Sequence, residues 1–326
     1  MHKPSVKPLI SIIVANYNYG HLINERLDSL FSQTFQDFEV IFIDDCSTDN
    51  SNQVVEFYSE RGNLRIISND CNKGWIQTSN NGAKLARGDF LLFANADDYS
   101  ANNLLEVLHK AQVANPGCAV YFSASTLVDE NGKEIGADFD FRERKFKRRL
   151  RDGGRIPSSW ANSLLSRSCI IPNLSSALID REKFMLAGGF GKAYAVCSDW
   201  ELFFNLSSTS DLFYIPEKLN FFRQHPKTIR SSQSRISLQF EVLSLVLKHR
   251  SKSGNTPIDR LSTSFYISTV VVELLRLSVL NEALEFTKPL KMLLKFDKLA
   301  VALLPLSFTF LLSMKVIKKF AVARDR

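Results

Sequence analysis

The sequence predicts an α/β fold: a mostly parallel sheet with helices on both faces, followed by a helical C-terminal extension. Three observations predict it. In the first hundred residues, short apolar runs alternate with segments of helical spacing, which is typical of a parallel sheet. Polar side chains gather where several of the predicted strands end. From about Gln233 glycine nearly disappears and Leu, Lys and Arg dominate with helical periodicity through Phe320.

The elements of the first hundred residues follow from their apolar spacing. Leu9–Ala15 is continuously apolar and rich in β-branched residues, as expected of a strand buried on both faces. His21–Gln33 carries its apolar residues at helical spacing. Gly88 provides a stop for the third helix. The remaining predicted elements alternate between strand and helix: Phe38–Ile43, Ser51–Tyr58, Leu64–Ser68, Ile76–Ala86 and Phe90–Ala94.

The middle of the chain follows a less regular pattern. Ala119–Ala124 is predicted to be a strand, and Asp129 to Gly132 is a turn signal that indicates a hairpin. Phe141–Arg155 is dense in Arg and Lys and is predicted to be a mobile basic loop, which either is solvated or contacts a phosphorylated acceptor. The later predictions are a strand and helix in Ser176–Gly189, a helix in Ser198–Leu206, and short strands in Leu212–Ile215 and Leu219–Arg223.

The stretch Leu299–Met314 in the predicted extension is uncharged and is followed by lysines. As a helix it would span about 24 Å, short of the roughly 30 Å hydrocarbon core of a bilayer, and Pro305 interrupts it. Two interpretations remain: a peripheral helix at a membrane surface, with lysines on anionic head groups, or a terminal helix packed on the catalytic domain.

Composition and charge limit the classes of protein to which the chain can belong. With 45% hydrophobic and 23% charged residues, the 326-residue chain has an ordinary globular composition. Its net charge of +7 favours anionic partners, but no nucleic-acid-binding motif is present. Five cysteines without a CxxC pair indicate a reduced intracellular protein, and residues 1–8 are too short and polar for a signal peptide. We therefore expect a cytoplasmic protein without a nucleic-acid partner.

Ligands of open parallel sheets bind beyond the carboxyl ends of the strands. The first predicted strand ends in Asn16, Tyr17 and Asn18, the second leads into residues 44–49, and the fourth into residues 95–98. Each run alone is compatible with a simple turn, but their coincidence at one edge predicts a site. Asp97 and Asp98 offer hard oxygen ligands for Mg²⁺ or Mn²⁺. No G-x-G-x-x-G and no P-loop follows the first strand, which argues against a dinucleotide dehydrogenase and a P-loop NTPase.

With these segments in place, residues 8–231 resemble the family 2 glycosyltransferases, which have the GT-A fold. The resemblance rests on the order and spacing of its motifs. They are Ile10–Asn18, the D-D-x-S-x-D element at Asp44–Asp49, Asn72–Gly74, Asn80–Asp98, Gly188-Gly189-Phe190, Ser198–Glu201 and Arg223-Gln224-His225. The chain departs from the family pattern at three positions, where Ser79, Asn95 and Ser198 replace the residues often found there.

The resemblance implies a role for each matched residue. Asp199 would be the catalytic base, Asp98 would bind the metal ion, Mn²⁺ or Mg²⁺, and His225 would be a further metal ligand or a diphosphate contact. Asp97 would contact the ribose or the metal ion. Residues implied at the donor are Ala15, Tyr17, Asn18, Asp44 and Asp97. Simpler interpretations stand beside these: Asp199 as a residue favoured at a helix N-terminus, and His225 as an ordinary loop histidine.

The resemblance also implies the reaction: transfer of a sugar, with inversion, from a nucleotide-sugar, by default a UDP-sugar, to a hydroxyl of a saccharide or lipid-linked saccharide. By family habit this would serve cell-surface polysaccharide synthesis at the cytoplasmic face of the inner membrane. We expect residues 1–231 to form the catalytic domain, with nucleotide-sugar binding in 8–100 and the acceptor side in 101–231, and 232–326 to form the extension. Two alternatives are a non-catalytic carbohydrate- or lipid-binding protein on the same scaffold and a sugar nucleotidyltransferase. A nucleotidyltransferase would require a Gly-rich basic loop after the first strand, and Asn16–Gly20 does not provide one.

Overall fold

The computed structural model describes residues 7–137, 150–171, 173–226, 234–250, 257–280, 294–295 and 297–307. The chain divides into two compact units. Unit 1 comprises Met1–Ala161, Ile170–Ala193 and Ser198–Pro226, and unit 2 comprises Asn162–Cys169, Tyr194–Cys197 and Lys227–Arg326. The expected boundary between residues 231 and 232 stays a prediction.

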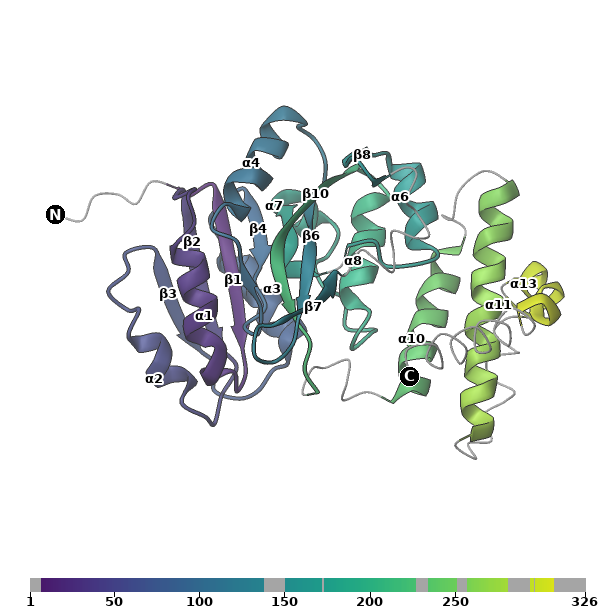
Figure 1. Ribbon diagram of the computed structural model, residues 1–326, viewed down its shortest axis with the longest axis horizontal. Coiled ribbons are helices and arrows are strands. Elements are labelled where there is room, and N and C mark those ends of the chain that lie inside the picture. Colours follow the sequence, from purple (N-terminus) through teal and green to yellow (C-terminus); the bar gives the residue numbers. More distant parts are fainter. Residues whose placement is uncertain are drawn as a thin grey trace, which may run out of the picture. The chain divides into compact units, whose positions relative to one another are not determined.

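Unit 1 is built on a ten-stranded sheet of order β3-β2-β1-β4-β9-β6-β10-β5, with β7 beside β6 and β8 beside β10 (Figure 1). The pairs β3-β2, β2-β1, β1-β4 and β6-β10 are parallel, whereas β9 runs antiparallel to both β4 and β6. The strands are β1 (Ile10–Asn16), β2 (Phe38–Asp44), β3 (Leu64–Ser68), β4 (Phe90–Phe93), β5 (Tyr99–Ser100), β6 (Val120–Val128), β7 (Glu134–Ala137), β8 (Gly154–Ile156), β9 (Ala177–Asp180) and β10 (Leu212–Arg223).

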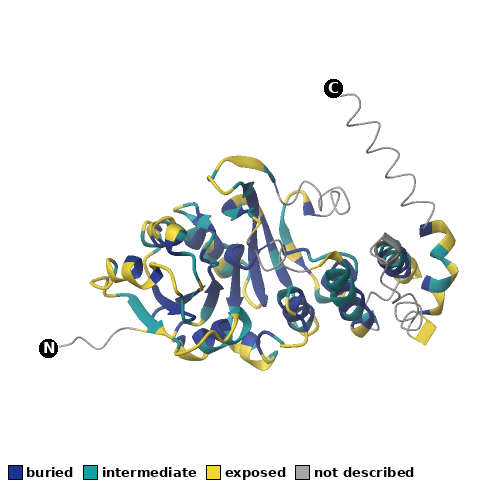
Figure 2. Cartoon of the chain, turned by 90° about the horizontal axis from the view of Figure 1, so that it is seen from below, coloured by how far each residue is buried: buried dark blue, intermediate teal, exposed yellow. Residues whose placement is uncertain are grey.

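Helices cover both faces of this sheet. They are α1 (Gly20–Phe31), α2 (Ser51–Glu56), α3 (Trp75–Leu85), α4 (Leu104–Ala114), the 3₁₀ turn η1 (Leu174–Ser176), α7 (Arg181–Leu186) and α8 (Ser198–Ser207). The helix α6 (Ser158–Leu165) begins in unit 1 and ends in unit 2. Figure 2 shows the central strands as buried and the outer surfaces of these helices as largely exposed. The predicted α/β fold with a parallel core is confirmed.

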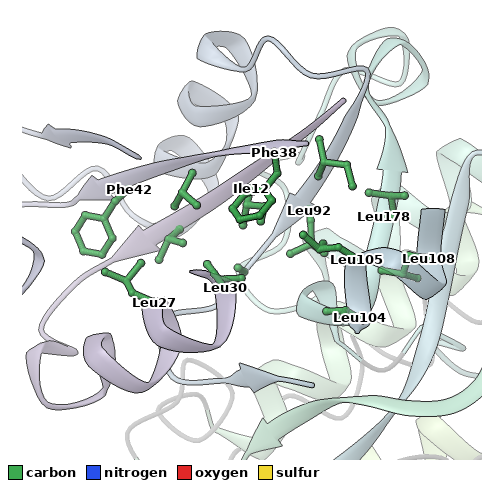
Figure 3. Close-up of a cluster of buried hydrophobic side chains, with 14 of the residues drawn as sticks. Ile12, Leu27, Leu30, Phe38, Phe42, Leu92, Leu104, Leu105, Leu108 and Leu178 are labelled. Atoms are coloured by element: carbon green, nitrogen blue, oxygen red, sulfur yellow. The ribbon is translucent and has the colours of Figure 1, made fainter. Parts of the chain in front are cut away.

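The core on one face of the sheet follows from the two-residue repeat of the strands. Ile12 and Phe42 point to the same face, where they pack with Leu27 and Leu30 of α1 and with leucines of α4 such as Leu105 (Figure 3). All of these side chains are at most 3% exposed. Burial of this apolar surface fixes the register of β1 against β2, because a slip of one residue would turn the apolar side chains to the other face.

The opposite face of the sheet packs against α3. Ile13 and Ile43, one residue out of phase with the first set, lie against Gly82 of this helix. A Cβ atom at Gly82 would come within 2.5 Å of the Ile13 side chain, so the close approach of helix and strand requires glycine there. Because helices pack on both faces of the sheet, the polar side chains gather at the ends of the parallel strands.

The structure corrects several predicted elements. The two strands expected in Leu212–Ile215 and Leu219–Arg223 form one strand, β10, with register shifts at Lys218 that accommodate the extra residues. Gly154 and Arg155, expected in the basic loop, belong to the strand β8 because they pair with β10. Residues 141–149 of that predicted loop lie outside the described residues. Helices α4 and α6 were not predicted, whereas the hairpin at the Asp129 turn is confirmed by the antiparallel pair β6-β7.

The described part of the C-terminal extension is helical, as predicted. It contains α10 (Arg235–Lys248), α11 (Pro257–Leu280) and α13 (Lys298–Ala302), and α11 packs on both of the others. The Asp297 carboxylate accepts the N–H of Ala300 and so caps α13, and it also binds Arg250 and Ser264. Within the described residues, no helix is both long and apolar enough to cross a bilayer. Residues 308–314 of the predicted apolar stretch lie outside the described residues.

Candidate functional site

The carboxyl ends of β1 and β2 lie side by side. Their parallel register pairs Asn16 with Asp44, and Asn16 Nδ2 donates to Asp44 Oδ1 at 2.9 Å. The backbone N–H of Ser47 donates to Asp44 Oδ2 at 2.9 Å. Asp44 is 1% exposed, and both of its oxygens accept bonds from the chain itself. A contact between Asp44 and a nucleotide base would use the lone pairs that these bonds leave.

Asp45, the next residue, organises a second loop. Its Oδ1 accepts the backbone N–H of Lys73 at 2.9 Å, and its Oδ2 accepts that of Gly74 at 2.8 Å. Asn69 donates to the same carboxylate at 2.8 Å. Asp45 therefore shapes the loop before α3.

Two non-glycine residues at this edge adopt the left-handed backbone region, Asn18 with φ of 60° and Cys46 with φ of 65°. This conformation costs free energy for L-residues, and in the described chain the hydrogen bonds around Asn18 sustain it. Its side chain accepts the N–H of Thr48 at 2.8 Å, and its own N–H donates to Ser47 Oγ at 2.9 Å. Tyr17 beside it is 44% exposed, so its ring is open to a stacking partner.

Asp98, which follows β4, is at the centre of a buried hydrogen-bond network. The residue is 1% exposed. Its Oδ2 accepts bonds from Asn173 Nδ2 at 2.6 Å and Ser175 Oγ at 2.7 Å, and its Oδ1 accepts the backbone N–H of Arg223 at 3.0 Å. Burial and the neighbouring Asp97 raise the pKa of Asp98 to about 7. The carboxylate thus ties η1 and the end of β10 to the end of β4.

Asp97 has a different environment. Its Oδ2 lies 3.0 Å from His225 Nε2, and the two side chains are 15% and 8% exposed. In the part of the chain that the structure describes, His225 is the one hydrogen-bond partner of the Asp97 carboxylate. Tyr19 contacts the His225 ring edge-on at 5.8 Å between centroids. Asp97 and His225 therefore form a pair at the surface of the edge, while Asp98 is covered.

Arg223 connects this pair to the rest of the unit. Its Nε donates to the carbonyl of Asp97 at 2.9 Å, and its Nη1 donates to the carbonyl of Glu130 at 2.7 Å. Its Nη2 forms an ion pair with Glu25 of α1. Arg223 is 2% exposed and so holds α1, the Asp129 hairpin and the Asp97 backbone in one arrangement.

Arg26, on the following residue of α1, is completely buried. Among the described residues, none of its three guanidinium nitrogens has a hydrogen-bond partner. Burial lowers its pKa to about 10, against the effect of Asp98 and Asp97, which favour the charged form. Ser29, one turn further along the helix, reaches Ser100 of β5, which places this face of α1 against the segment that follows Asp98. The guanidinium is a positive charge beneath the two carboxylates.

Asp199 is the second residue of the helix α8, in the same unit. It is partly exposed, and its Oδ1 accepts the N–H of Trp200 at 2.7 Å. Just before it, Ser198 Oγ donates to the carbonyl of Gly191 at 2.7 Å. A carboxylate in the first turn of a helix is stabilised by the helix dipole, so this geometry agrees with both interpretations considered for Asp199.

The structure thus brings the expected residues together in two groups. Donor-side Ala15, Tyr17, Asn18 and Asp44 lie at the ends of β1 and β2, and Asp97, Asp98 and His225 lie beyond β4 and β10. Since β4 pairs with β1, both groups lie at the same edge of the sheet. Across the described residues, no three His, Cys, Asp or Glu side chains form a cluster that could hold a metal ion alone.

Sequence reasoning missed residues that support the site. Arg26 could have been found, because it is a charged residue among the apolar positions of the α1 pattern. Asn173 and Ser175 carried no comparable signal, because their role depends on a contact with Asp98 across 75 and 77 positions of sequence. The same holds for Glu25, whose partner Arg223 lies 198 residues away.

Part of the chain matches a known protein family. The model of Glycosyl transferase family 2 matches residues 11–168. The uncharacterized glycosyltransferase EpsJ of Bacillus subtilis is 37% identical over 123 residues, which is 36% of each chain. The poly(ribitol-phosphate) β-N-acetylglucosaminyltransferase TarS of Staphylococcus aureus is 44% identical over 92 residues, 27% of this chain and 16% of TarS. The matches thus span about a third or less of these relatives.

Solved structures share the fold. S. aureus TarS 1-349 in complex with UDP-GlcNAc superimposes with a TM-score of 0.66 and 19% identity, covering 89% of this chain and 81% of that one. The mannosyltransferase PcManGT of Pyrobaculum calidifontis, in complex with GDP-Man and Mn²⁺, gives a TM-score of 0.53 and 18% identity over 93% of this chain and 85% of that one. The predicted GT-A architecture is confirmed, and residues 11–168 of the chain match the model of Glycosyl transferase family 2.

Proposed function

We propose that this protein is a metal-dependent, inverting glycosyltransferase that transfers a sugar from a nucleotide-sugar to a hydroxyl group of a saccharide or lipid-linked saccharide. The pair of Asp97 and His225, beside the buried Asp98 at the carboxyl edge of the sheet, carries the proposal. The family match supports the reaction class. The UDP-GlcNAc bound to TarS supports a uridine diphosphate donor.

The arrangement of Asp97 and His225 fits a divalent cation. On an octahedral ion with ligand bonds of about 2.1 Å, two adjacent ligands lie about 3.0 Å apart, and Asp97 Oδ2 lies 3.0 Å from His225 Nε2. A site with two protein ligands leaves the remaining positions for water and substrate phosphates, which is how Mg²⁺ is commonly held. The Mn²⁺ in the PcManGT structure supports the choice of ion.

This assignment moves the metal ligand from Asp98, the residue implied by family resemblance, to Asp97. Both oxygens of Asp98 accept bonds from the chain's own donors, and the residue is 1% exposed. Oδ2 is taken up by Asn173 and Ser175, so coordination by Asp98 would depend on the remaining lone pair of Oδ1, which already accepts the N–H of Arg223 and is covered by the chain. Asp98 instead fixes the position of the backbone segments that contain Asp97 and His225.

The chain's own residues would act on the donor and the acceptor. Tyr17 would stack on the base and Asn18 would hold the turn beneath it. A metal ion at Asp97 and His225 would neutralise the charge that develops on the leaving diphosphate. Asp199 would take the proton from the acceptor hydroxyl while its oxygen bonds to the anomeric carbon and the bond from that carbon to the diphosphate breaks. A single displacement of this kind inverts the anomeric configuration.

The direct test combines a panel of nucleotide-sugars with the Asp199→Asn variant. We expect UDP-sugars to raise the melting temperature of the protein in the presence of Mn²⁺, and one of them to support transfer or slow hydrolysis. Asp199→Asn should keep the thermal shift and lose turnover by at least about 10²-fold, the usual effect of removing a general base. Full turnover in this variant would reject the assignment of the base, and the absence of any thermal shift or hydrolysis across the panel would favour the non-catalytic alternative.

Contact of the C-terminal extension with a membrane surface stays a prediction, as does a role in cell-surface polysaccharide synthesis at the cytoplasmic face of the membrane. In the described part of the extension, Leu299 and Leu306 are 43% and 62% exposed, and Lys298 is exposed beside them. Apolar and basic side chains together favour anionic lipid surfaces. Sedimentation with anionic vesicles, reversed by salt, would support this contact, and the absence of binding at low salt would favour the packed alternative.

A further inference from the structure

Glu241 of α10 forms a compact set of hydrogen bonds with the chain just before α8. Its Oε1 accepts the backbone N–H of Ala195 at 3.0 Å, and its Oε2 accepts those of Val196 and Cys197 at 2.9 Å and 3.1 Å. All of these residues belong to unit 2, because Tyr194–Cys197 groups with the C-terminal extension. One carboxylate of the extension thus binds three consecutive backbone groups of a segment more than forty residues upstream.

Three successive N–H groups that point to one place form a concave site for an anion. Residues 195–197 are not part of a helix or strand, so no regular secondary structure satisfies their N–H groups. A charged carboxylate is a stronger acceptor for them than a neutral group. The segment therefore takes its conformation from Glu241 to a large extent.

This segment leads directly into the proposed catalytic base. Cys197 is two residues before Asp199, and α8 begins at Ser198. Ser198 Oγ donates to the carbonyl of Gly191, which lies upstream in the chain. A Cβ atom at Gly191 would come within 2.3 Å of Glu201 Oε2. The start of α8 thus has a tight fit at Gly191 and a segment held by Glu241 immediately before it.

We infer that Glu241 is a positioning residue for the transfer reaction: it fixes residues 195–197 and thereby the location of the Asp199 carboxylate. The inference rests on the proposed function, which assigns Asp199 as the base. A displacement of about 1 Å in a reacting group can lower turnover by about 10²-fold, so a loosened segment should reduce turnover while donor binding at the ends of β1, β2 and β4 persists. Through Glu241, the C-terminal extension would accordingly contribute to catalysis.

The test uses the full-length protein and the variants Glu241→Ala and Glu241→Gln, with Gln239→Ala on the same helix as the matched control. Hydrogen exchange reports directly on the N–H groups of residues 195–197. Glu241→Ala should lose their protection and lower kcat by about 10–100-fold, with the KM for the donor changed by less than about twofold. Glu241→Gln keeps one acceptor oxygen and should give a smaller loss of both protection and kcat, and Gln239→Ala should change neither.

The Asp199→Asn variant separates the two hypotheses. If it loses turnover while Glu241→Ala loses amide protection and keeps kcat, the base is correct and the positioning role is overturned. If Asp199→Asn keeps turnover, the proposed base is wrong, whatever Glu241 does. A parallel rise in donor KM and fall in kcat would mean that Glu241 acts on the whole site rather than on the base, and would also overturn the inference. Should Glu241→Ala fail to fold, Glu241→Gln carries the same comparison.

Discussion

The two carboxylate groups at the edge of the sheet are built in different ways. Asp44 and Asp45, at the end of β2, bind partners that lie within 31 residues of them, in the turns after β1, β2 and β3. After β4, Asp98 accepts a bond from nearby Asn95 at 3.3 Å, but its other partners and the partner of the Asp97 carboxylate lie 75 to 128 residues away, at η1, at the end of β10 and just after it. The first group is complete when the first three strands have formed, whereas the second requires the whole of unit 1.

The comparison favours the second group for the proposed cation site. The Asp44 and Asp45 oxygens are used mainly to shape turns, and we propose that this side of the edge receives the nucleoside. On the other side, buried Asp98 and Arg223 hold Asp97 and His225 beside one another. Under the proposed function, nucleoside recognition and cation binding would then depend on separate parts of the structure.

The largest effect is expected from removal of the metal ion. Chelation by EDTA should lower turnover by at least about 10³-fold, because the developing charge on the diphosphate then loses its main electrostatic partner. Binding of UDP should weaken as well, whereas binding of uridine should change by less than about twofold. Calorimetric titration of both ligands with and without EDTA measures this. Equal losses for uridine and UDP would mean that the two parts of the edge are not separate.

The second effect concerns the buried network. Asp98→Asn places an amide donor against the donors Asn173 and Ser175, so we expect a loss of about 3 kcal/mol in the free energy of unfolding. Asp89→Asn is the matched control, because Asp89 is an exposed residue at the other end of β4 whose partner Lys7 is also exposed. Denaturant unfolding compares the two, and a loss below about 1 kcal/mol for Asp98→Asn would contradict a structural role for this carboxylate.

A smaller loss of stability is expected at Arg223. Arg223→Lys keeps the charge but cannot reach Glu25 and the carbonyls of Asp97 and Glu130 at once, and should cost about 2 kcal/mol. The same unfolding experiment applies, with exposed Arg235→Lys as the control. If the hydrogen bonds of Arg223 hold Asp97 in place, the variant should also need a higher Mn²⁺ concentration for half-maximal activity. An unchanged Mn²⁺ requirement would show that Arg223 does not act on the cation site.

The smallest effect is expected on the nucleoside side. Gly74 has φ of 80° and ψ of 154°, a backbone region that is almost exclusive to glycine, and a Cβ atom at this residue would meet no other atom within 4 Å. Gly74→Ala should therefore cost about 1–2 kcal/mol, the lower part of the usual range for backbone strain alone. Gly62→Ala is the matched control, since its Cβ would also meet no atom and its φ is not positive. A cost well above about 3 kcal/mol, the upper end of that range, would show that the Asp45 loop is more tightly coupled to the rest of the unit than its local bonds indicate.

Much of the fold could be predicted from the sequence, because local patterns determine it. β3 has the predicted bounds, β2 and β4 differ from the predicted strands by one residue at one end, and β1 is shifted by one residue at both ends. The prediction was wrong where context decides: β10 continues through a bend at Lys218, and Gly154 and Arg155 became part of a strand by pairing with it. Apolar spacing cannot show such pairing, because it depends on which strand lies alongside.

The candidate site, like the fold, could be predicted only in part from the sequence. The predicted strand ends are enough to place Asp44 and Asp97 at one edge, because strand ends of a parallel sheet meet there, whereas His225 was implied only by the family resemblance. The choice between Asp97 and Asp98 could not be made, since adjacent carboxylates look alike in a sequence. Their roles differ only through Asn173, Ser175 and the backbone of Arg223, which reach Asp98 from distant segments.

The assignment of the cation to Asp97 is tested most directly by titrating Mn²⁺ in the presence of UDP and following the free ion by electron paramagnetic resonance, with Asp97→Asn and Asp98→Asn compared at a temperature where both are folded. Asp97→Asn should weaken Mn²⁺ binding by at least about 100-fold, and Asp98→Asn by no more than about 10-fold, since it acts through the residues that hold the ligand. The opposite order, with binding kept in Asp97→Asn and lost in Asp98→Asn, would contradict the account.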